Sequence, residues 1–389
     1  MNLAKRMANL GTETAFEVLA RAKALEAEGK SVIHLEIGEP DFDTPPNVVE
    51  AGARALRTGH THYTPSAGVP MLREAIAQEM ARTRGVPVHA EQVVVCPGAK
   101  PIMFFAILAL VDEGDEVVYP NPGFPIYESM IRFVGAKPVP IALPEENDFR
   151  LDVDGLVRSL TPRTRMVILN SPQNPTGGVL EKADLKRIAE AVAKLPNCWV
   201  LSDEIYRRIL YVPGEHPSIL AEHAMRDRTI VLDGFSKAFA MTGWRLGYGV
   251  MPKELAVHVA RLMTNSNSCT ATFTQIAGVE ALNGDQSSVT KMVEEFRRRR
   301  DAIVAGLNRV KGFRCRTPKG AFYVFPNITG TGRKSKELQD LLLNEIGVAC
   351  LSGTSFGEKG EGYLRFSYAN SLERIEAAVE RLVRHFGSA

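Results

Sequence analysis

Residues 166–177 of the chain, MVILNSPQNPTG, decide the fold class. The unbroken apolar run Met166–Leu169 is followed at once by polar residues and two prolines, which is typical of a buried strand that ends in a turn. Four further apolar runs share this pattern, at 93–96, 117–119, 199–202 and 229–232. Predicted helices alternate with the strands, near 101–111, 124–134, 181–195 and 205–210. This alternation predicts an α/β domain with a mostly parallel sheet that is covered by helices on both faces.

The two ends of the chain have a different texture. Before the alternating region we expect helices at 14–28, 46–58 and 69–84 and a strand at 32–37. After it we expect a long charged helix at 287–310, short strands at 321–325, 348–351 and 363–367, and a last helix at 372–386. We therefore predict an N-terminal segment (1–44) that joins a smaller α+β domain (285–389), and a large domain between them (45–284).

Composition excludes several classes of protein. The 389 residues are 45% hydrophobic and carry 47 Lys and Arg against 45 Asp and Glu, a globular mix with net charge +2. Disorder is excluded by this mix, and neutrality gives no reason to expect a nucleic-acid partner. The longest apolar run, 101–111, is shorter than the ~20 residues of a membrane-spanning helix. Five scattered cysteines indicate reduced thiols and a cytoplasmic protein, and no metal-ligand motif is expected.

Residues directly after the predicted strands carry the candidate chemistry. In open α/β sheets, ligands bind outside the carboxyl ends of the strands. Taken singly, each segment there could be a turn, a helix cap or a surface lysine, but together they predict one site. The segments are Pro97–Lys100, Pro120–Phe124, Asn170–Gly177, Asp203–Tyr206 and Asp233–Lys237, with Arg245 eight residues beyond the lysine.

This set of side chains fits the needs of pyridoxal 5′-phosphate. The cofactor requires a lysine for a Schiff base, an acid for its pyridine nitrogen and a cup for its phosphate. Lys237 is the predicted Schiff-base lysine and later the general acid and base, and Asp203 is the predicted partner of the ring nitrogen. The other predicted cofactor contacts are Tyr206 and Asn174 at the ring oxygen, Gly98, Ala99, Ser236 and Arg245 at the phosphate, and Phe124 stacked on the ring.

Over about residues 10–387 the chain resembles the fold-type I, class I/II aminotransferases. The motifs are GEPDF (38–42), HYTPSAG (62–68), SPQNPTG (171–177), SDEIY (202–206), SKAFAMTGWRLG (236–247) and RFSYA (365–369). The resemblance implies the fold-type I architecture, with a mostly parallel seven-stranded sheet between helices and a smaller α+β domain. It also implies that Arg365 clamps the substrate α-carboxylate with help from the backbone of Gly38. Tyr63 would reach the phosphate of a neighbouring subunit, which implies a homodimer with shared active sites.

Two positions depart from the pattern of the family. Many relatives have Ser or Thr three residues before the lysine, where this chain has Gly234. One phosphate contact is therefore expected to be missing or replaced. The ring-stacking position, often Trp or Tyr, is Phe124, whose apolar area should still hold the ring.

The implied reaction is a ping-pong transamination from an L-amino acid to a 2-oxo acid. In a prokaryotic aspartate aminotransferase subgroup with the same Gly-x-Lys pattern, the lysine that matches Lys100 approaches the side-chain carboxylate of a dicarboxylic substrate. We therefore expect aspartate as donor and 2-oxoglutarate as acceptor. The alternative for Lys100 is a solvated residue at a helix start, which would say nothing about the substrate. The alternatives are an aromatic, alanine-like or specialised amino acid, or a β-lyase reaction. A binding module that has lost the chemistry is disfavoured by the intact set of site residues.

Overall fold

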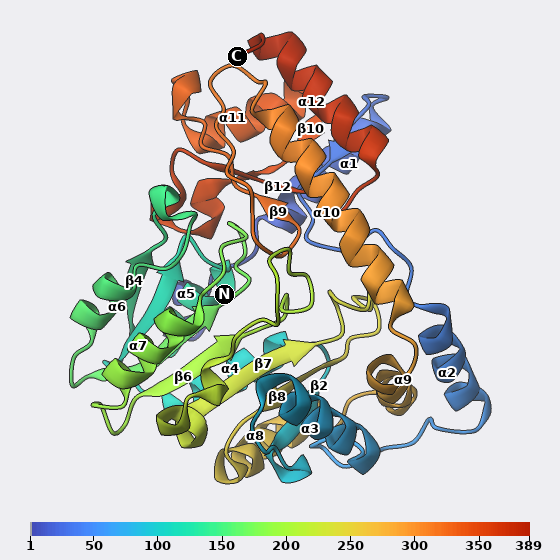
Figure 1. The fold of residues 1–389 in the computed structure, drawn as a ribbon, viewed down its shortest axis with the longest axis vertical. Helices are drawn as coiled ribbons and strands as arrows, with labels where there is room; N and C mark the ends of the chain where they lie inside the picture. The colour runs from blue at the N-terminus through green and yellow to red at the C-terminus, as the bar shows by residue number, and fades with distance from the viewer. Residues whose placement is uncertain (1) are drawn as a thin grey trace.

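A mostly parallel seven-stranded sheet forms the centre of the protein, whose computed structural model describes residues 2–389 (Figure 1). The strand order is β2-β8-β7-β6-β5-β3-β4, and only β8 runs antiparallel to its neighbours. The strands are β2 (Val93–Cys96), β3 (Glu116–Asn121), β4 (Lys137–Ala142), β5 (Thr164–Asn170), β6 (Trp199–Asp203), β7 (Thr229–Gly234) and β8 (Gly247–Val250). The predicted fold class and the seven-stranded sheet are confirmed.

Helices cover both faces of this sheet. Successive residues of a strand point to opposite faces, so in β3 Val117 and Tyr119 pack against one layer and Val118 against the other. The first layer holds α4 (Lys100–Leu110), α5 (Pro125–Phe133) and α8 (Lys253–Asn267), and the second holds α6 (Val153–Ser159) and α7 (Lys182–Val192). The β2 and β8 end of the sheet packs on α2 (Pro46–Arg57), α3 (Pro70–Arg84) and α9 (Thr272–Asn283).

Both chain ends contribute to a second group of elements. Strand β1 (Ile33–His34) pairs in parallel with β10 (Val348–Ala349), so helix α1 (Ala15–Ala27) lies beside C-terminal elements, blue beside red in Figure 1. The remaining elements are α10 (Ser287–Leu307), β9 (Tyr323–Val324), α11 (Ser335–Leu341), β11 (Leu351–Ser352), β12 (Leu364–Ser367) and α12 (Leu372–Phe386). Strands β11, β12 and β9 form an antiparallel sheet in that order. The exact domain boundaries stay a prediction.

The predicted helix at 205–210 is wrong. The chain turns there instead, with hydrogen bonds from Arg207 N to Glu204 O (2.9 Å) and from Ile209 N to Tyr206 O (2.8 Å). Leu210 then pairs with Gly320 in an antiparallel bridge, which requires an extended backbone and so prevents a helix. The predicted strand at 32–37 is shorter than expected because only Ile33 and His34 form a ladder with β10. Sequence patterns missed β4, β8, α6, α8, α9 and α11.

None of the helices in residues 2–389 has the length and apolar character needed to cross a membrane. All five cysteines are unpaired thiols. The cytoplasmic location stays a prediction.

Candidate active site

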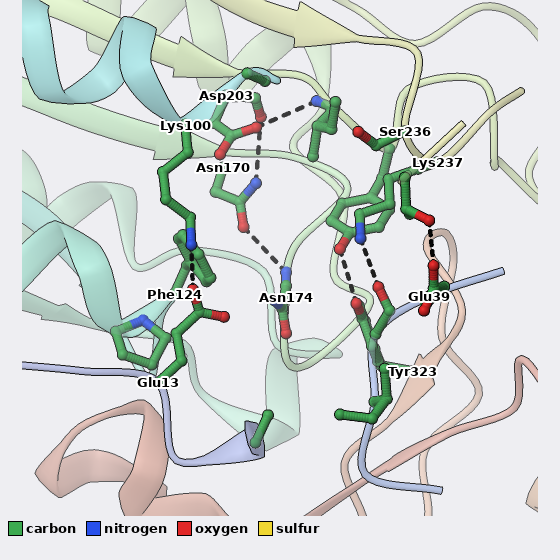
Figure 2. A pocket seen from close by; sticks show the side chains of 18 of the residues that line it. Glu13, Glu39, Lys100, Phe124, Asn170, Asn174, Asp203, Ser236, Lys237 and Tyr323 are labelled. Atoms are coloured by element: carbon green, nitrogen blue, oxygen red, sulfur yellow. Dashed lines mark hydrogen bonds and ion pairs between the residues drawn. The ribbon is translucent and has the colours of Figure 1, made fainter. Parts of the chain in front are cut away.

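A cavity of about 470 Å³ lies at the carboxyl ends of β5, β6 and β7, where the sheet meets β9, β12 and the N-terminal segment. Figure 2 shows its side chains converging from these separate elements. The cavity brings together most of the site residues predicted from the sequence: Gly38, Ala99, Lys100, Phe124, Asn174, Asp203, Tyr206, Ser236, Lys237, Arg245 and Arg365. Two predicted residues, Gly98 and Tyr63, do not line it.

Lys237 lies three residues beyond the end of β7 and points into the cavity. Its Nζ donates a hydrogen bond to the backbone oxygen of Gly38 and lies 6.0 Å and 5.9 Å from the ring centroids of Tyr206 and Phe322. Burial lowers the pKa of Lys237 to about 8, although the carboxylate of Glu39 opposes the shift. A far larger fraction of this amine is neutral near pH 7 than of an ordinary lysine, so it is poised as a nucleophile.

Asp203 ends β6 and is buried at the floor of the cavity. Its Oδ2 accepts a hydrogen bond from the Tyr127 hydroxyl (2.6 Å) and its Oδ1 accepts one from Ile205 N (3.2 Å). Burial raises the pKa of Asp203 to about 6, and the carboxylates of Asp233 and Glu204 add to the rise. A cationic partner would stabilise the ionised form of this carboxylate, because the partner offsets the free-energy cost of burying the negative charge.

Arg365 enters the cavity from β12 and is buried. Its Nη1 donates to Asn174 Oδ1 (3.2 Å), and its Nη2 donates to the backbone oxygen of Glu36. Within residues 2–389, its buried Nε has no hydrogen-bond partner. Burial lowers the pKa of this guanidinium. An unsatisfied donor on a buried cation predicts a carboxylate ligand, since guanidinium groups bind carboxylates with two parallel hydrogen bonds.

The start of α4 and Arg245 form an anion-binding end. Gly98 has φ +86°, and a Cβ on it would lie 2.4 Å from Arg245 Nη2. Only glycine therefore allows this guanidinium to approach the helix start, where backbone N–H groups and the helix dipole favour an anion. Arg245 is held by a hydrogen bond from its Nη1 to Thr242 O (2.7 Å), and Ser236 is buried in the same cavity.

Gly234, where many relatives carry Ser or Thr, is tightly packed. It pairs with Gly247 across β7 and β8. A Cβ on Gly234 would lie 3.0 Å from Gly247 Cα and 3.2 Å from Leu246 O. A serine or threonine side chain there would need the backbone of the neighbouring strand to shift by a few tenths of an ångström.

The residues present fit pyridoxal 5′-phosphate. Three features meet at this one cavity. They are Lys237, whose pKa is lowered, Asp203, whose pKa is raised by burial, and the anion-binding end formed by Gly98 and Arg245. These three features correspond to the aldehyde, the pyridine nitrogen and the phosphate of the cofactor.

Several residues of the cavity were missed by the sequence patterns. Tyr127 follows Phe124 by one helical turn, so its spacing was an available signal. The hydroxyl of Tyr323 lies 2.8 Å from the hydroxyl of Tyr206. A Cβ on Gly38 would lie 2.2 Å from the same Tyr323 hydroxyl. No local signal marks Tyr323, because β9 reaches the cavity only through tertiary packing.

Tyr63 lies outside the cavity. Its side chain is 88% exposed, and its predicted role at a neighbouring subunit stays a prediction.

Lys100, the first residue of α4, faces the cavity from the side opposite Lys237 in Figure 2. Its Nζ forms an ion pair with Glu13 and lies 5.4 Å from the centroid of the Phe124 ring. Its half-exposed side chain is thus directed along the cavity wall rather than into open solvent.

Comparisons with known proteins agree with this geometry. Residues 30–382 match the family described as aminotransferase class I and II. Aspartate aminotransferase of Pyrococcus horikoshii is 42% identical over 94% of this chain and 92% of its own. Aromatic-amino-acid aminotransferase 2 of Thermococcus litoralis is 40% identical over 91% of both chains. The solved structure of aspartate aminotransferase from Thermus thermophilus with maleate superposes with a TM-score of 0.94, at 37% identity and 99% coverage of each chain.

The family, the fold and the converging site residues point to one class of enzyme. The chain belongs to the class I and II aminotransferases, which use pyridoxal 5′-phosphate to transfer amino groups.

Proposed function

We propose that the chain transfers the amino group of L-aspartate to a 2-oxo acid, with 2-oxoglutarate as the acceptor. The observation that carries the proposal is the presence of two separate cationic side chains, Arg365 and Lys100, in the cavity that holds Lys237. An amino acid with a carboxylate at each end matches this pair, one carboxylate on the guanidinium and the other on the ammonium. The relatives named as aspartate aminotransferases support the same substrate.

When bound, the cofactor supplies an electron sink for the negative charge that develops at the substrate α-carbon. The residues of the chain do the rest. Arg365 orients the substrate through its α-carboxylate, and Lys237 removes the α-proton as general base and returns it as general acid. Asp203 would hold the proton on the ring nitrogen, and Tyr206 and Asn174 would donate hydrogen bonds at the ring oxygen. Two half-reactions follow, in which an amino acid leaves as a 2-oxo acid before the second 2-oxo acid enters.

An aromatic amino acid is the second candidate donor. Phe16, Phe124 and Phe356 line the same cavity and offer apolar contacts to a ring. The relative from Thermococcus litoralis is named for aromatic amino acids.

Lys100→Met is expected to separate these candidates. The variant keeps the apolar stem and removes the charge, so kcat/KM for aspartate should fall by roughly 10–100-fold, the cost of a hydrogen bond between charged groups. The values for alanine and phenylalanine should change by less than about two-fold. Steady-state kinetics with each donor measures this, and Lys253→Met, on the exposed start of α8, is the control. An unchanged ratio of aspartate to alanine would remove Lys100 from substrate recognition.

We also propose that the enzyme is a homodimer with shared active sites. Exposed side chains around Tyr63 support this assembly. The phenol of Tyr63 is itself exposed, and the helices that precede and follow it in the chain, α2 and α3, expose the apolar side chains of Val49, Leu56 and Met71. Light scattering should give twice the 42.7 kDa of the chain. Tyr63→Phe should bind the cofactor roughly ten-fold more weakly without dissociating the dimer, because it loses one hydrogen bond to a phosphate. A monomeric holoenzyme would contradict the proposal.

A further inference from the structure

The ammonium of Lys100 already has a carboxylate partner from its own chain. Glu13, in the segment just before α1, forms an ion pair with Lys100 inside the cavity, and Figure 2 shows the two side chains pointing toward each other. Across residues 2–389, Glu13 accepts no other side-chain hydrogen bond, and Lys100 has no other acidic partner within 4.0 Å. The cation assigned to the distal carboxylate of the substrate is therefore neutralised before substrate arrives.

Two carboxylates at this one ammonium would repel each other. Among residues 2–389, Lys100 is the only cation within 4.0 Å of the Glu13 carboxylate, while Arg365 and Lys237 feel its charge from farther away. A substrate carboxylate that joined the pair would bring a second negative charge without a second cation at ion-pair distance. Exchange is easier than sharing, because the pair is partly open to water. The Lys100 side chain is 48% exposed and that of Glu13 22%, and exposed ion pairs are weak.

The segment that carries Glu13 is anchored independently of Lys100. Gly11 N donates a hydrogen bond to Ser129 Oγ (2.9 Å) on α5, and Thr14 begins the turn into α1. The chain on either side of Glu13 is thus held by contacts that do not involve Lys100, and the Glu13 side chain, which is 22% exposed, borders solvent.

We propose that Glu13 is a specificity-determining residue that occupies the distal-carboxylate position as an internal competitor. A dicarboxylic substrate displaces its carboxylate and takes over Lys100. A substrate without a side-chain carboxylate leaves the pair intact, and the neutral pair then forms part of the cavity wall. One site thus accepts both kinds of side chain without leaving a bare ammonium. This inference rests on the proposed role of Lys100 in aspartate binding.

Binding of two unreactive acids to the holoenzyme tests the proposal. Succinate carries a distal carboxylate and butanoate does not, and calorimetric titration at fixed pH and ionic strength gives both dissociation constants. Glu13→Gln keeps the size of the side chain and removes its charge. It should bind succinate roughly two- to five-fold more tightly, the strength of an exposed ion pair, and butanoate with unchanged affinity. Glu17→Gln makes the same charge change on an exposed position one turn along α1 and should alter neither constant.

A double-mutant cycle with Lys100→Met completes the test. The effect of Glu13→Gln should differ when Lys100 is already replaced, because it then reports only repulsion between Glu13 and succinate and no longer the breaking of the ion pair. Equal or weaker succinate binding by Glu13→Gln, or the same gain with and without Lys100, overturns the internal competitor. A different result would contradict the proposed aspartate site instead. In that case Lys100→Met would prefer succinate over butanoate as strongly as the wild-type enzyme does. The two failures are therefore distinguishable.

Discussion

Lys237→Ala is expected to lower turnover with every amino-acid donor by roughly 10⁴-fold or more, the upper range for loss of a general acid–base group. Of the two lysines that line the cavity within residues 2–389, Lys100 is paired with Glu13, whereas Lys237 Nζ lies 6.0 Å from the ring centroid of Tyr206. Lys237 is therefore the amine that we expect to hold the cofactor and to move the α-proton. Steady-state kinetics and the absorbance of protein-bound cofactor measure the effect. The exposed Lys253→Ala should behave as wild type. Full turnover and wild-type cofactor absorbance in Lys237→Ala would remove the lysine from the reaction.

The pH dependence of cofactor capture gives an independent readout of the same lysine. Only the neutral amine attacks an aldehyde, and burial lowers the pKa of Lys237 to about 8 from the 10.5 of an ordinary lysine. The rate at which the cofactor-free protein captures pyridoxal phosphate should therefore rise with pH up to about 8 and then level off. A rate that keeps rising toward pH 10 would show an ordinary, solvated amine.

Asp203→Asn is expected to lower kcat by roughly 10²–10³-fold, as for removal of a buried electrostatic group at a reacting centre. The amide keeps the size of the side chain and can still accept from Tyr127, but it cannot balance a proton on the ring nitrogen. The exposed Asp227→Asn is the matched control. A kcat within two-fold of wild type would contradict the role given to Asp203.

Stability of the cofactor-free protein separates this role from a structural one. The pKa of Asp203 is raised to about 6, so the native protein binds the proton more tightly than the unfolded chain does. The stability it contributes is complete below pH 4 and is lost as the pH rises from about 4 to 6. At pH 7.5 Asp203→Asn should therefore stabilise the cofactor-free protein, by about 1–3 kcal/mol, while it lowers activity. Urea unfolding measures this, and destabilisation would contradict the account.

The sequence predicted the site best where chemistry follows a strand directly. Asp203, Asn174 and Lys237 each lie at or just beyond the end of a buried strand, and parallel strands bring their carboxyl ends to one edge. Residues that arrive from elsewhere were harder to find. Tyr323 reaches the cavity from a two-residue strand, and Glu13 from the segment before α1. Their positions depend on tertiary packing that no local pattern records.

The errors in the fold also have physical causes. Strand β8 was missed because two of its four residues, Gly247 and Gly249, have low strand propensity. Close packing requires glycine at position 247, because a Cβ on Gly247 would lie 2.3 Å from Ala99 N. The segment after Asp203 has helix-forming composition, yet the bridge between Leu210 and Gly320 holds it extended. In both places tertiary contacts override local preference.

A single-turnover experiment tests the central claim most directly. The purified holoenzyme is mixed with excess L-aspartate in the absence of any 2-oxo acid, and the oxaloacetate released is counted against the number of active sites. The account predicts one oxaloacetate per chain, no further release, and renewed release when 2-oxoglutarate is added. No release from aspartate, or continuous product formation without an acceptor, would contradict it.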